Sequence, residues 1–347
     1  MDIDDLYMGR CLQLAKNGIR DVAPNPMVGA VIVHNGKIIG EGYHRKCGQA
    51  HAEPNAIASV KDEYLLEQST LYVSLEPCSH YGKTPPCAEL IIKKRIPRVV
   101  IGMEDPNPLV AGKGIQMLRQ AGVEVTVGVL EQQCRQLNKR FICYHEKKRP
   151  YIILKWAQSA DFKIDVCRQS SSESVAVISN TITKQLVHKM RAENMAIMVG
   201  THTALLDNPS LRTTRWNGNN PLRVVIDKQL RLPENSKLLQ PIAPTLVFTE
   251  KAAYPFETSA ELCQIDFAGN AWQQMLDELF RRKIHSLIVE GGTVLLDSLL
   301  QIGLWDEIHV ETSPCLLGKG VEAPRIALLP DIEEFYDGHA IRYYYNK

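Results

Sequence analysis

The sequence predicts two α/β domains in series, residues 1–146 and residues 150–347. Short β-rich runs alternate with stretches of helical periodicity both before and after Pro150, which is the pattern of layered α/β domains. At 347 residues the chain is also long for a single hydrophobic core. Residues 146–150 read EKKRP, a charged run that ends in proline. This run is the candidate linker, although the solvated end of a helix would have the same composition.

The first half contains several predictable elements. Residues 28–33 and 37–40 flank Asn35-Gly36, a dipeptide typical of a tight hairpin turn. Residues 71–75 and 98–102 are expected to be buried strands, and each is followed by a loop with proline and then by a helical stretch. Residues 131–145 are expected to form one helix that closes this half.

The second half repeats the alternation of strands and helices. The predicted strands are residues 151–156, 196–200, 223–227, 245–249, 286–289 and 307–311. Between them, a stripe at helical spacing consists of Trp272, Met275, Leu276, Leu279 and Phe280. An apolar stripe of this kind indicates a helix packed on the core rather than a cofactor site.

The composition bounds the class of protein. Lys and Arg total 40 and Asp and Glu total 39, a formal charge of +1, so the basic excess of a typical nucleic-acid binder is missing. The longest apolar runs are too short to cross a bilayer, and the acidic first residues are unlike a signal peptide. We therefore expect a cytoplasmic protein whose nine cysteines are reduced thiols, some of them metal ligands.

A zinc site is the strongest functional signal in the sequence. His51 precedes a helical stretch, Cys78 follows a strand and a proline, and Cys87 begins the next helical pattern. One His and two Cys form a ligand set for Zn²⁺ that leaves the fourth tetrahedral position open to water. Two thiolates balance the charge of the ion, and helix N-termini favour the thiolate form. Zinc in such a site lowers the pKa of its bound water towards neutrality.

Glu53, two residues after His51, is the candidate catalytic residue. Zinc nucleobase deaminases combine a Glu in an H-x-E motif with a downstream Pro-Cys and a further Cys, and this Glu acts as general acid and base. It has to lie within hydrogen-bond reach of both the attacking water and the substrate. The motifs and their order therefore predict a hydrolytic deaminase.

Three other interpretations of these residues remain open. In a closed structural zinc site a fourth protein ligand would be needed, and His80 is the candidate. A nucleic-acid base deaminase would need single-stranded substrate binding that weakens steeply with salt, against which the neutral composition argues. A non-enzymatic fold stabilised by zinc would be unaffected by the loss of Glu53.

The segment between the two cysteines resembles a particular family. Eight residues separate Cys78 from Cys87, whereas nucleic-acid and cytidine deaminases typically have two. The segment is similar to the signature of the bifunctional riboflavin-biosynthesis deaminase–reductase family. Matching stretches are residues 24–29 (PNPMVG), 42–44 (GYH), 51–56 (HAEPNA), 105–108 (DPNP), 112–114 (GKG), 207–211 (DNPSL) and 290–292 (EGG). The resemblance spans nearly the whole chain and is more specific in the first half.

The resemblance implies a fold and an activity for each domain. The first would be a zinc-dependent pyrimidine deaminase with a cytidine-deaminase-like three-layer α/β/α fold, and the second an NADPH-dependent reductase with a dihydrofolate-reductase-like α/β fold. The first would remove the 2-amino group of 2,5-diamino-6-ribosylamino-4(3H)-pyrimidinone 5′-phosphate by hydrolysis. The second would reduce the ribosyl group and give 5-amino-6-(5-phosphoribitylamino)uracil. The family also implies a homodimer or a higher homo-oligomer.

Further site residues follow from the resemblance. In the deaminase half, Asn25, His44, His80 and Lys83 would orient the substrate, because Asn can read a ring edge and His and Lys can bind phosphate or ring oxygens. In the reductase half, the expected substrate residues are Lys155, Ser174, Arg191, Leu211, one of Arg212 and Arg215, and Glu290. An arginine suits the substrate phosphate, and Glu290 would contact the sugar hydroxyls.

The expected cofactor site lacks a Rossmann fingerprint. Instead Gly291 and Gly292 form a turn between a strand and a helix, where backbone N–H groups can approach the phosphates of NADPH. The other expected cofactor residues are Ala157, Ala176, Thr203, Asp207, Asp227 and Thr293. Asp207 is a candidate for the acid that assists opening of the sugar ring, or for an anchor of the ligands.

The second half also departs from the family pattern. Phe162 stands where a glycine is usual, and Ala176 and Ile178 replace the aromatic and the threonine that would flank the nicotinamide. Arg212 is an extra residue in a Leu-Thr-x-Arg stretch. These departures leave a second enzymatic interpretation open, a zinc deaminase whose reductase-like domain has lost or weakened hydride transfer.

Overall fold

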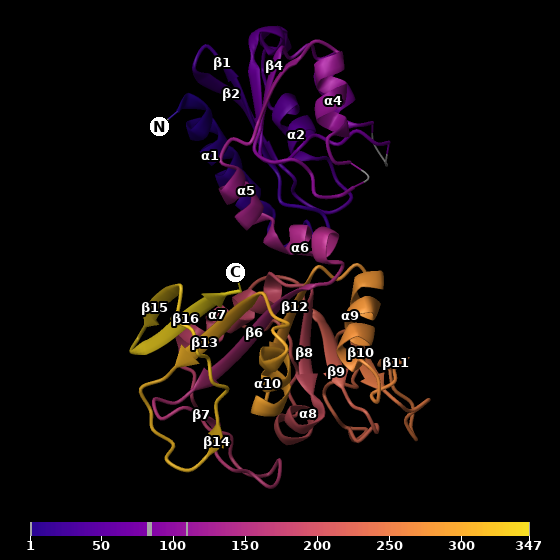
Figure 1. Ribbon diagram of the computed structural model, residues 1–347, viewed down its shortest axis with the longest axis vertical. Helices are drawn as coiled ribbons and strands as arrows, with labels where there is room; N and C mark the ends of the chain where they lie inside the picture. Colours follow the sequence, from indigo (N-terminus) through magenta and orange to yellow (C-terminus); the bar gives the residue numbers. More distant parts are fainter. Residues whose placement is uncertain (1, 82–84, 109, 347) are drawn as a thin grey trace. The chain divides into compact units, whose positions relative to one another are not determined.

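The computed structural model describes residues 2–81, 85–108 and 110–346. The chain divides into two compact units, Met1–Lys148 and Arg149–Lys347 (Figure 1). The division falls within the charged run at residues 146–150. Each unit has its own main sheet and its own hydrophobic core.

The first unit is built on a sheet with the strand order β2-β1-β3-β4-β5. Its strands are β1 (Gly29–His34), β2 (Lys37–Tyr43), β3 (Thr70–Val73), β4 (Arg98–Ile101) and β5 (Glu124–Val127). β1 is antiparallel to β2 and β3, whereas β3, β4 and β5 run parallel. The predicted hairpin is confirmed, because Asn35 and Gly36 join β1 to β2 with φ angles of 47° and 72°, as a two-residue hairpin turn requires.

Helices cover both faces of this sheet. They are α1 (Ile3–Ala15), α2 (Ala52–Ala58), α3 (Cys87–Lys93), α4 (Lys113–Gln120), α5 (Glu131–Leu137) and α6 (Lys139–Lys147), with 3₁₀ turns at Lys16–Gly18 and Glu63–Gln68. Gly29 abuts α1 so closely that a Cβ there would lie 2.0 Å from the carbonyl oxygen of Cys11, whereas a Cβ on Gly42 would meet the backbone of α2. Gly42 pairs with Ala30, the neighbour of Gly29 on β1, and neighbouring residues of a strand point to opposite faces. The helices α1 and α2 therefore pack on opposite faces of the sheet, and the expected three-layer arrangement is confirmed (Figure 1).

The prediction of one helix over residues 131–145 is wrong. The helix breaks at Asn138, which separates α5 from α6 and has φ −102° and ψ 21°. The buried Asn138 side chain accepts a hydrogen bond from the N–H of Met27 at 2.8 Å and donates one to its carbonyl oxygen at 2.9 Å. Periodicity did not show the break, because its cause is a contact 111 residues away in the sequence. This contact also holds the loop that carries Asn25.

The second unit is built on a sheet with the strand order β11-β10-β9-β8-β12-β6-β13-β16-β15. Its strands are β6 (Tyr151–Gln158), β8 (Ala196–Gly200), β9 (Leu222–Ile226), β10 (Thr245–Thr249), β11 (Glu261–Gln264), β12 (Ser286–Glu290), β13 (Glu307–Thr312), β15 (Ile332–Tyr336) and β16 (His339–Tyr345). The sheet is parallel except where β16 meets β13 and β15. The strands expected from the sequence all form, and β11, β15, β16 and a small pair of β7 (Lys163–Asp165) with β14 (Val321–Glu322) add to them.

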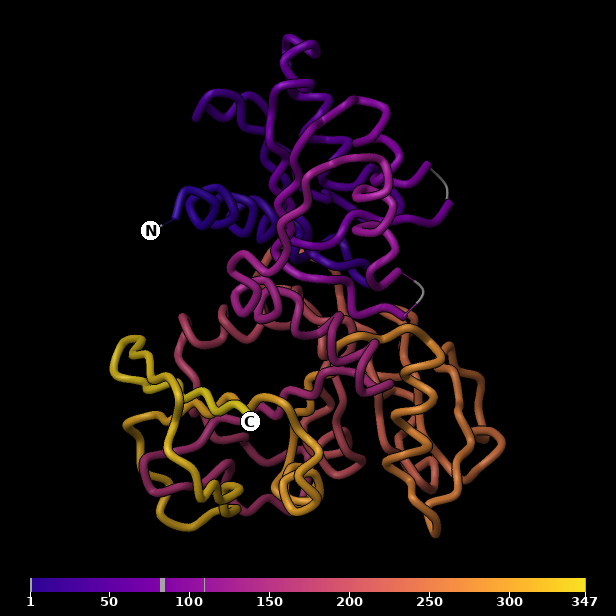
Figure 2. The backbone as a smooth tube through the Cα atoms, turned by 45° about the horizontal axis from the view of Figure 1, so that its top comes forward, coloured from indigo at the N-terminus to yellow at the C-terminus, as the bar shows by residue number. Residues whose placement is uncertain are grey.

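The two faces of the second sheet carry separate apolar clusters. One contains Ile197 and Val199 of β8 with residues from α7 (Thr181–Ala192) and α8 (Thr201–Asp207). The other contains Ala196 and Met198 with residues from α9 (Ala271–Arg281) and α10 (Thr293–Gln301). The predicted stripe on α9 is confirmed as core packing, since Met275, Leu276 and Leu279 are buried in this cluster. Figure 2 follows the same path as a backbone tube. Among the described residues, no helix combines the length and the apolar character that crossing a membrane requires.

Replacement of Asn138 by alanine tests the clamp on Met27, that is, the two hydrogen bonds between the Asn138 side chain and the backbone of Met27. We expect Asn138→Ala to destabilise the first unit by about 2 kcal/mol, because the N–H and C=O of Met27 lose their partners. Urea unfolding followed by circular dichroism measures the loss. All four tryptophans lie in the second unit, so their fluorescence transition should not move. The exposed Asn17→Ala is the control, and equal stability of the two variants would contradict the clamp.

Candidate functional site

Three potential metal ligands converge in the first unit. Nδ1 of His51 lies 3.6 Å from Sγ of Cys78 and 3.4 Å from Sγ of Cys87. The ligand atoms of these three residues all lie within 4.8 Å of one another. Among the described residues, this group contains no fourth His, Cys, Asp or Glu. The arrangement fits a zinc ion with an open position, and it does not support the closed site with His80 as a ligand.

Strand ends and helix N-termini place these ligands. His51 is the N-cap residue of α2, and Cys87 is the first residue of α3. Cys78 follows β3, and its sulfur accepts a hydrogen bond of 3.3 Å from the N–H of Cys87. The carbonyl oxygen of Cys78 accepts a further one from Ala88 at 3.2 Å. Backbone donors at the start of a helix favour a thiolate.

The three groups already perturb one another's protonation. A hydrogen bond with the Cys87 thiol is the main cause that lowers the pKa of Cys78 to about 4, and the same bond raises the pKa of Cys87. A hydrogen bond with Cys78 raises the pKa of His51. One imidazole nitrogen and two sulfurs are therefore in direct contact, as in the donor set of a zinc site.

Glu53 lies beside these ligands in the first turn of α2 and is 3% exposed. Burial raises the pKa of Glu53 to about 7, against the opposing influence of His51. A carboxyl group that titrates near neutrality can both accept and return a proton. The position and the environment of Glu53 match those of a general acid–base group.

One of the predicted substrate residues, His44, lies next to His51, and a second, Asn25, is in contact with His44. The rings of His44 and His51 are 5.3 Å apart in an edge-on arrangement. Nε2 of His44 is 3.1 Å from Nδ2 of Asn25, and Nδ1 of His44 is 3.0 Å from the carbonyl oxygen of Ala50. Burial lowers the pKa of His44, so the ring is neutral at physiological pH and can serve as a donor or an acceptor.

The remaining deaminase predictions have different outcomes. His80 lies near the half-buried Asp105, and desolvation raises the pKa of Asp105 to about 6 while His80 opposes the rise. Lys83 lies outside the described residues. Sequence reasoning missed Glu76, a buried acid directly before Pro77-Cys78 that accepts four backbone hydrogen bonds. An acidic residue at the end of an apolar strand was the signal that could have indicated it.

The second unit brings three predicted substrate residues together. Arg191 and Glu290 form an ion pair of 3.1 Å, and Lys155 lies beside Glu290 in the register of β6 and β12. Burial would raise the pKa of Glu290, but Arg191 and Lys155 together lower it. Among the described residues, Oε1 of Glu290 and Nε of Arg191 are buried atoms without a hydrogen-bond partner. Buried polar atoms left without a hydrogen-bond partner, next to an ion pair, are typical of a site for a polar ligand.

More cationic groups surround this pair. Nη1 of Arg191 donates to the carbonyl oxygen of Arg212 at 3.2 Å. His188 accepts a hydrogen bond from the N–H of Thr214 at 3.0 Å. Burial lowers the pKa of His188, and Arg191 and Arg215 act in the same direction. Within the described part of the chain, Nε of Arg212 is buried without a hydrogen-bond partner, whereas the residue Arg215 is exposed. The Leu211 side chain is packed in the core, 3% exposed, so it is not available to a ligand.

The predicted glycine turn has the expected form. Gly291 adopts a φ of 129°, a conformation that other residues rarely adopt, and a Cβ there would lie 2.9 Å from Oγ1 of Thr203. Thr203 Oγ1 accepts a hydrogen bond from Gly292 N–H at 3.1 Å. Gly292 is the N-cap residue of α10, and Thr293 opens the helix. The turn thus packs against Thr203 of α8 and is hydrogen-bonded to it.

Asp207 makes an ion pair that the sequence did not suggest. The guanidinium of Arg168, whose side chain is 4% exposed, contacts both Asp207 and Asp165. Asp165 also accepts a hydrogen bond from the N–H of Ala176 at 3.0 Å. These contacts connect residues 166–180, which include Ser174, to the end of α8. The ion pair with Arg168 thus fixes the Asp207 carboxylate at the end of α8.

Asp227 has a different environment from the one expected of a cofactor residue. It is completely buried and accepts hydrogen bonds from Arg231 N–H at 3.0 Å, Leu232 N–H at 2.9 Å and the Tyr254 hydroxyl at 3.2 Å. These bonds close the turn after β9. Its carboxylate therefore serves the fold in this structure and does not face a cleft.

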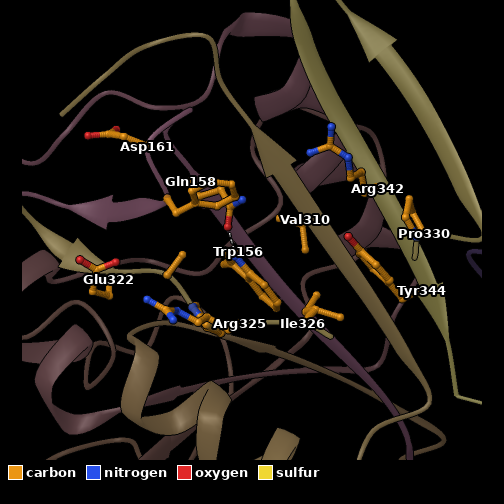
Figure 3. A pocket seen from close by; sticks show the side chains of 13 residues that line it. Trp156, Gln158, Asp161, Val310, Glu322, Arg325, Ile326, Pro330, Arg342 and Tyr344 are labelled. Atoms are coloured by element: carbon orange, nitrogen blue, oxygen red, sulfur yellow. Dashed lines mark hydrogen bonds between the residues drawn. The ribbon is translucent and has the colours of Figure 1, made fainter. Parts of the chain in front are cut away.

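A cavity of about 480 Å³ lies elsewhere in the second unit (Figure 3). Trp156 and Gln158 of β6 line it, whereas Lys155 and Ala157 alternate with them. Successive side chains on a strand point to opposite faces. The cavity is therefore on the other face of the sheet from Lys155, Ala157 and Glu290, and it does not include the predicted substrate and cofactor residues.

Comparison with known proteins identifies both halves. The model of the cytidine and deoxycytidylate deaminase zinc-binding region matches residues 1–103, and that of the RibD C-terminal domain matches residues 150–333. Riboflavin biosynthesis protein RibD of Actinobacillus pleuropneumoniae is 41% identical over 326 residues, covering 91% of this chain and 85% of the relative. The RibD protein of Aquifex aeolicus is 41% identical and covers 92% and 89%.

Solved structures agree with these matches. The crystal structure of a diaminohydroxyphosphoribosylaminopyrimidine deaminase/5-amino-6-(5-phosphoribosylamino)uracil reductase from Thermotoga maritima has a TM-score of 0.87 at 36% identity, covering 98% of each chain. Acinetobacter baumannii RibD has a TM-score of 0.86 at 32% identity with the same coverage. Fold and matches together define a zinc-binding deaminase domain fused to a reductase domain. The chain belongs to the RibD family of bifunctional riboflavin-biosynthesis enzymes.

Metal analysis tests the three-ligand site. The protein as isolated is expected to hold about one zinc ion per chain, and Cys87→Ser to hold almost none after dialysis, because a serine hydroxyl does not ionise to replace the thiolate. Cys47→Ser, at an exposed cysteine away from the group, is the matched control and should keep its zinc. Full zinc content in Cys87→Ser would contradict the assignment.

Proposed function

We propose that the first unit hydrolyses the 2-amino group of 2,5-diamino-6-ribosylamino-4(3H)-pyrimidinone 5′-phosphate and that the second reduces the product with NADPH. The observation that carries the deaminase half is the convergence of His51, Cys78 and Cys87 next to the buried carboxyl group of Glu53. The name of the Thermotoga maritima protein describes the same pair of activities. The substrate of this chain is inferred from that likeness.

In the deaminase half, the zinc ion that His51, Cys78 and Cys87 would hold supplies Lewis-acid activation of a water molecule. Glu53 would accept one proton from the attacking water and pass it to the ring nitrogen, then take the remaining proton of the added hydroxyl and deliver it to the leaving amine. The pKa of about 7 suits Glu53 to both directions of transfer. Asn25 and the neutral His44, which are in contact, orient the pyrimidine by its ring edge.

In the reductase half, we assign the substrate phosphate to Arg191 and Arg212. Their Nε atoms are buried without partners among the described residues, and a guanidinium can grip phosphate through two parallel hydrogen bonds. Arg212 is preferred over Arg215 because the latter is exposed. Glu290, with one oxygen paired to Arg191 and the other unpaired, is suited to accept hydrogen bonds from the sugar hydroxyls, with Lys155 beside it.

The cofactor is assigned to the glycine turn and the strand ends near it. Gly291, Gly292 and Thr293 begin α10 next to Thr203, and their N–H groups suit the phosphates of NADPH. Ala157 lies on the same face of β6 as Lys155, so the nicotinamide ring would lie against Ala157. Asp207 acts as an anchor held by Arg168. Hydride chemistry belongs to the cofactor, and the protein supplies its orientation.

The departures at Ala176 and Ile178 do not favour loss of reduction over its retention. Ser179, one residue after Ile178, offers a hydroxyl that donates to Glu311 at 2.6 Å. Glu311 lies beside Ala157 in the register of β6 and β13. A polar group is thus available near the place of the missing threonine. The cytoplasmic location, the choice of NADPH over NADH and the homo-oligomer remain predictions.

Substitution of Glu53 separates binding from catalysis in the first unit. Glu53→Gln is expected to keep its zinc and to lose at least about 10²-fold in ammonia release, because the proton carrier is removed while the ligands stay. Ammonia release from the ribosylated pyrimidine phosphate measures the effect. Glu41→Gln is the control, because Glu41 lies on β2 and its carboxylate is paired with Arg10 of α1. Normal deamination by Glu53→Gln would overturn the proposal.

An NADPH oxidation assay with the deaminated intermediate tests the second unit. We expect turnover well above background in the unaltered protein and its loss in Lys155→Ala, with ammonia release by the first unit unchanged. Lys237→Ala, an exposed lysine outside the proposed cleft, should behave like the unaltered protein. Absence of turnover in the unaltered protein would favour a reductase-like domain that no longer transfers hydride.

A further inference from the structure

Glu76 occupies an unusual position for an acidic residue. It is 4% exposed and lies two residues before Cys78 in the loop that leaves β3. Its own N–H donates to the carbonyl oxygen of Met103 at 2.9 Å, beyond the end of β4. Its side chain therefore starts from a fixed point between two strand ends. A buried acid in such a place needs several donors to offset its desolvation.

Four backbone N–H groups supply those donors. Oε1 of Glu76 accepts hydrogen bonds from Gly114 at 2.8 Å and Ile115 at 3.2 Å. Oε2 accepts them from Gly112 at 3.0 Å and Asp105 at 3.2 Å. Gly112 is the N-cap residue of α4, and Gly114 and Ile115 lie in its first turn. The carboxylate thus caps α4 from a distant part of the chain and also holds the loop at Asp105.

The backbone packs as closely as the hydrogen bonds suggest. A Cβ on Gly114 would lie 2.0 Å from the carbonyl oxygen of Pro77, so the start of α4 lies directly against the residue between Glu76 and Cys78. The φ angle of Pro77 is fixed by its ring, and a residue before proline is confined to extended conformations. A displacement of Glu76 is therefore transmitted to Cys78 through a stiff link of one residue.

The same carboxylate reaches a second loop beside the metal centre. The N–H of Asp105 donates a hydrogen bond to the Glu76 carboxylate. The side chain of Asp105 in turn accepts a hydrogen bond from the N–H of Asn107 at 2.8 Å. Burial raises the pKa of Asp105, and the nearby Glu76, His80 and Cys78 influence this pKa as well. Two motifs, DPNP at residues 105–108 and GKG at residues 112–114, supply no residue to the proposed proton transfer or to the zinc ligands. Both meet at the oxygens of Glu76.

We propose that Glu76 is the positioning residue of the zinc centre, which fixes the Cys78 loop against the DPNP loop and the start of α4 through four backbone hydrogen bonds. Among the described contacts its carboxylate makes no hydrogen bond with a metal-ligand side chain, and it acts through Pro77. The inference rests on zinc binding by His51, Cys78 and Cys87 but not on the identity of the substrate. Tests that follow zinc and backbone protection, rather than ammonia release, keep it distinguishable from the proposed activity.

Zinc release from the holoprotein measures this role directly. Glu76→Gln replaces one acceptor oxygen by an NH₂ group that faces N–H donors, so we expect zinc loss to a chelator to accelerate at least about tenfold. The matched control is Glu104→Gln, because Glu104 is exposed and its carboxylate lies near Gly112 without a hydrogen bond to the helix among the described contacts. A second control, Asp227→Asn, removes a buried carboxylate that accepts backbone N–H groups in the other unit.

Each outcome decides the proposal. Faster zinc release in Glu76→Gln alone supports it. Release at the unaltered rate, even with a less protected α4, would leave Glu76 as a helix cap and overturn the proposal. Equal acceleration in Glu76→Gln and Glu104→Gln would also overturn it, because the effect would then come from charge near the helix and not from the hydrogen bonds.

Hydrogen exchange on the unaltered protein tests the same proposal without a substitution, so the result does not depend on whether a variant folds. Coupling between two sites is reciprocal, so removal of zinc should raise amide exchange at Gly112, Gly114 and Ile115 at least about fivefold. The amides of Arg231 and Leu232, which Asp227 binds in the other unit, are the internal reference and should not change. Unchanged exchange at the start of α4 after zinc removal would overturn the proposal.

Discussion

The proximity of one imidazole nitrogen to two sulfurs is the constraint on which the first unit depends. His51, Cys78 and Cys87 come from three separate segments, and each stands at a helix start or just beyond a strand end. These are the places where backbone direction changes sharply, so a small error in a loop would separate the ligands by ångströms. Both ligand-bearing helices are only seven residues long. Their stability has to come from packing on the sheet rather than from helix propensity.

The sequence predicted the elements of the metal centre because its signals are local. His51 and Glu53 share one helix start, Cys78 follows a strand, and Asn35-Gly36 marks a turn by backbone geometry alone. The residues that it did not predict act over long separations. Asn138 breaks a helix to bind Met27 across 111 residues, and Arg168 pairs with Asp207 across 39. Neither partner can be recognised from periodicity or spacing, since only the tertiary structure brings them together.

The reductase half illustrates the same limit at the level of a whole site. Lys155, Arg191 and Glu290 lie on β6, on α7 and at the end of β12, and only the parallel register of β6 and β12 sets Lys155 next to Glu290. No spacing in the sequence encodes that register. Asp227 shows the converse case, because an acid at the end of a strand is equally suited to close a turn. A residue type at a strand end therefore does not by itself distinguish a site from a turn.

Strand alternation explains how one sheet can carry both a reactive face and a core. On β6, Lys155 and Ala157 face the proposed cleft while Leu154 and Trp156 enter the apolar cluster on the other side. A shift of one residue in the pairing of β6 would exchange these faces and bury Lys155 in that cluster. Burial of an unpaired ammonium costs far more than a lost hydrogen bond. The position of Lys155 is thus fixed by the packing of the opposite face, so the core and the site specify the same register.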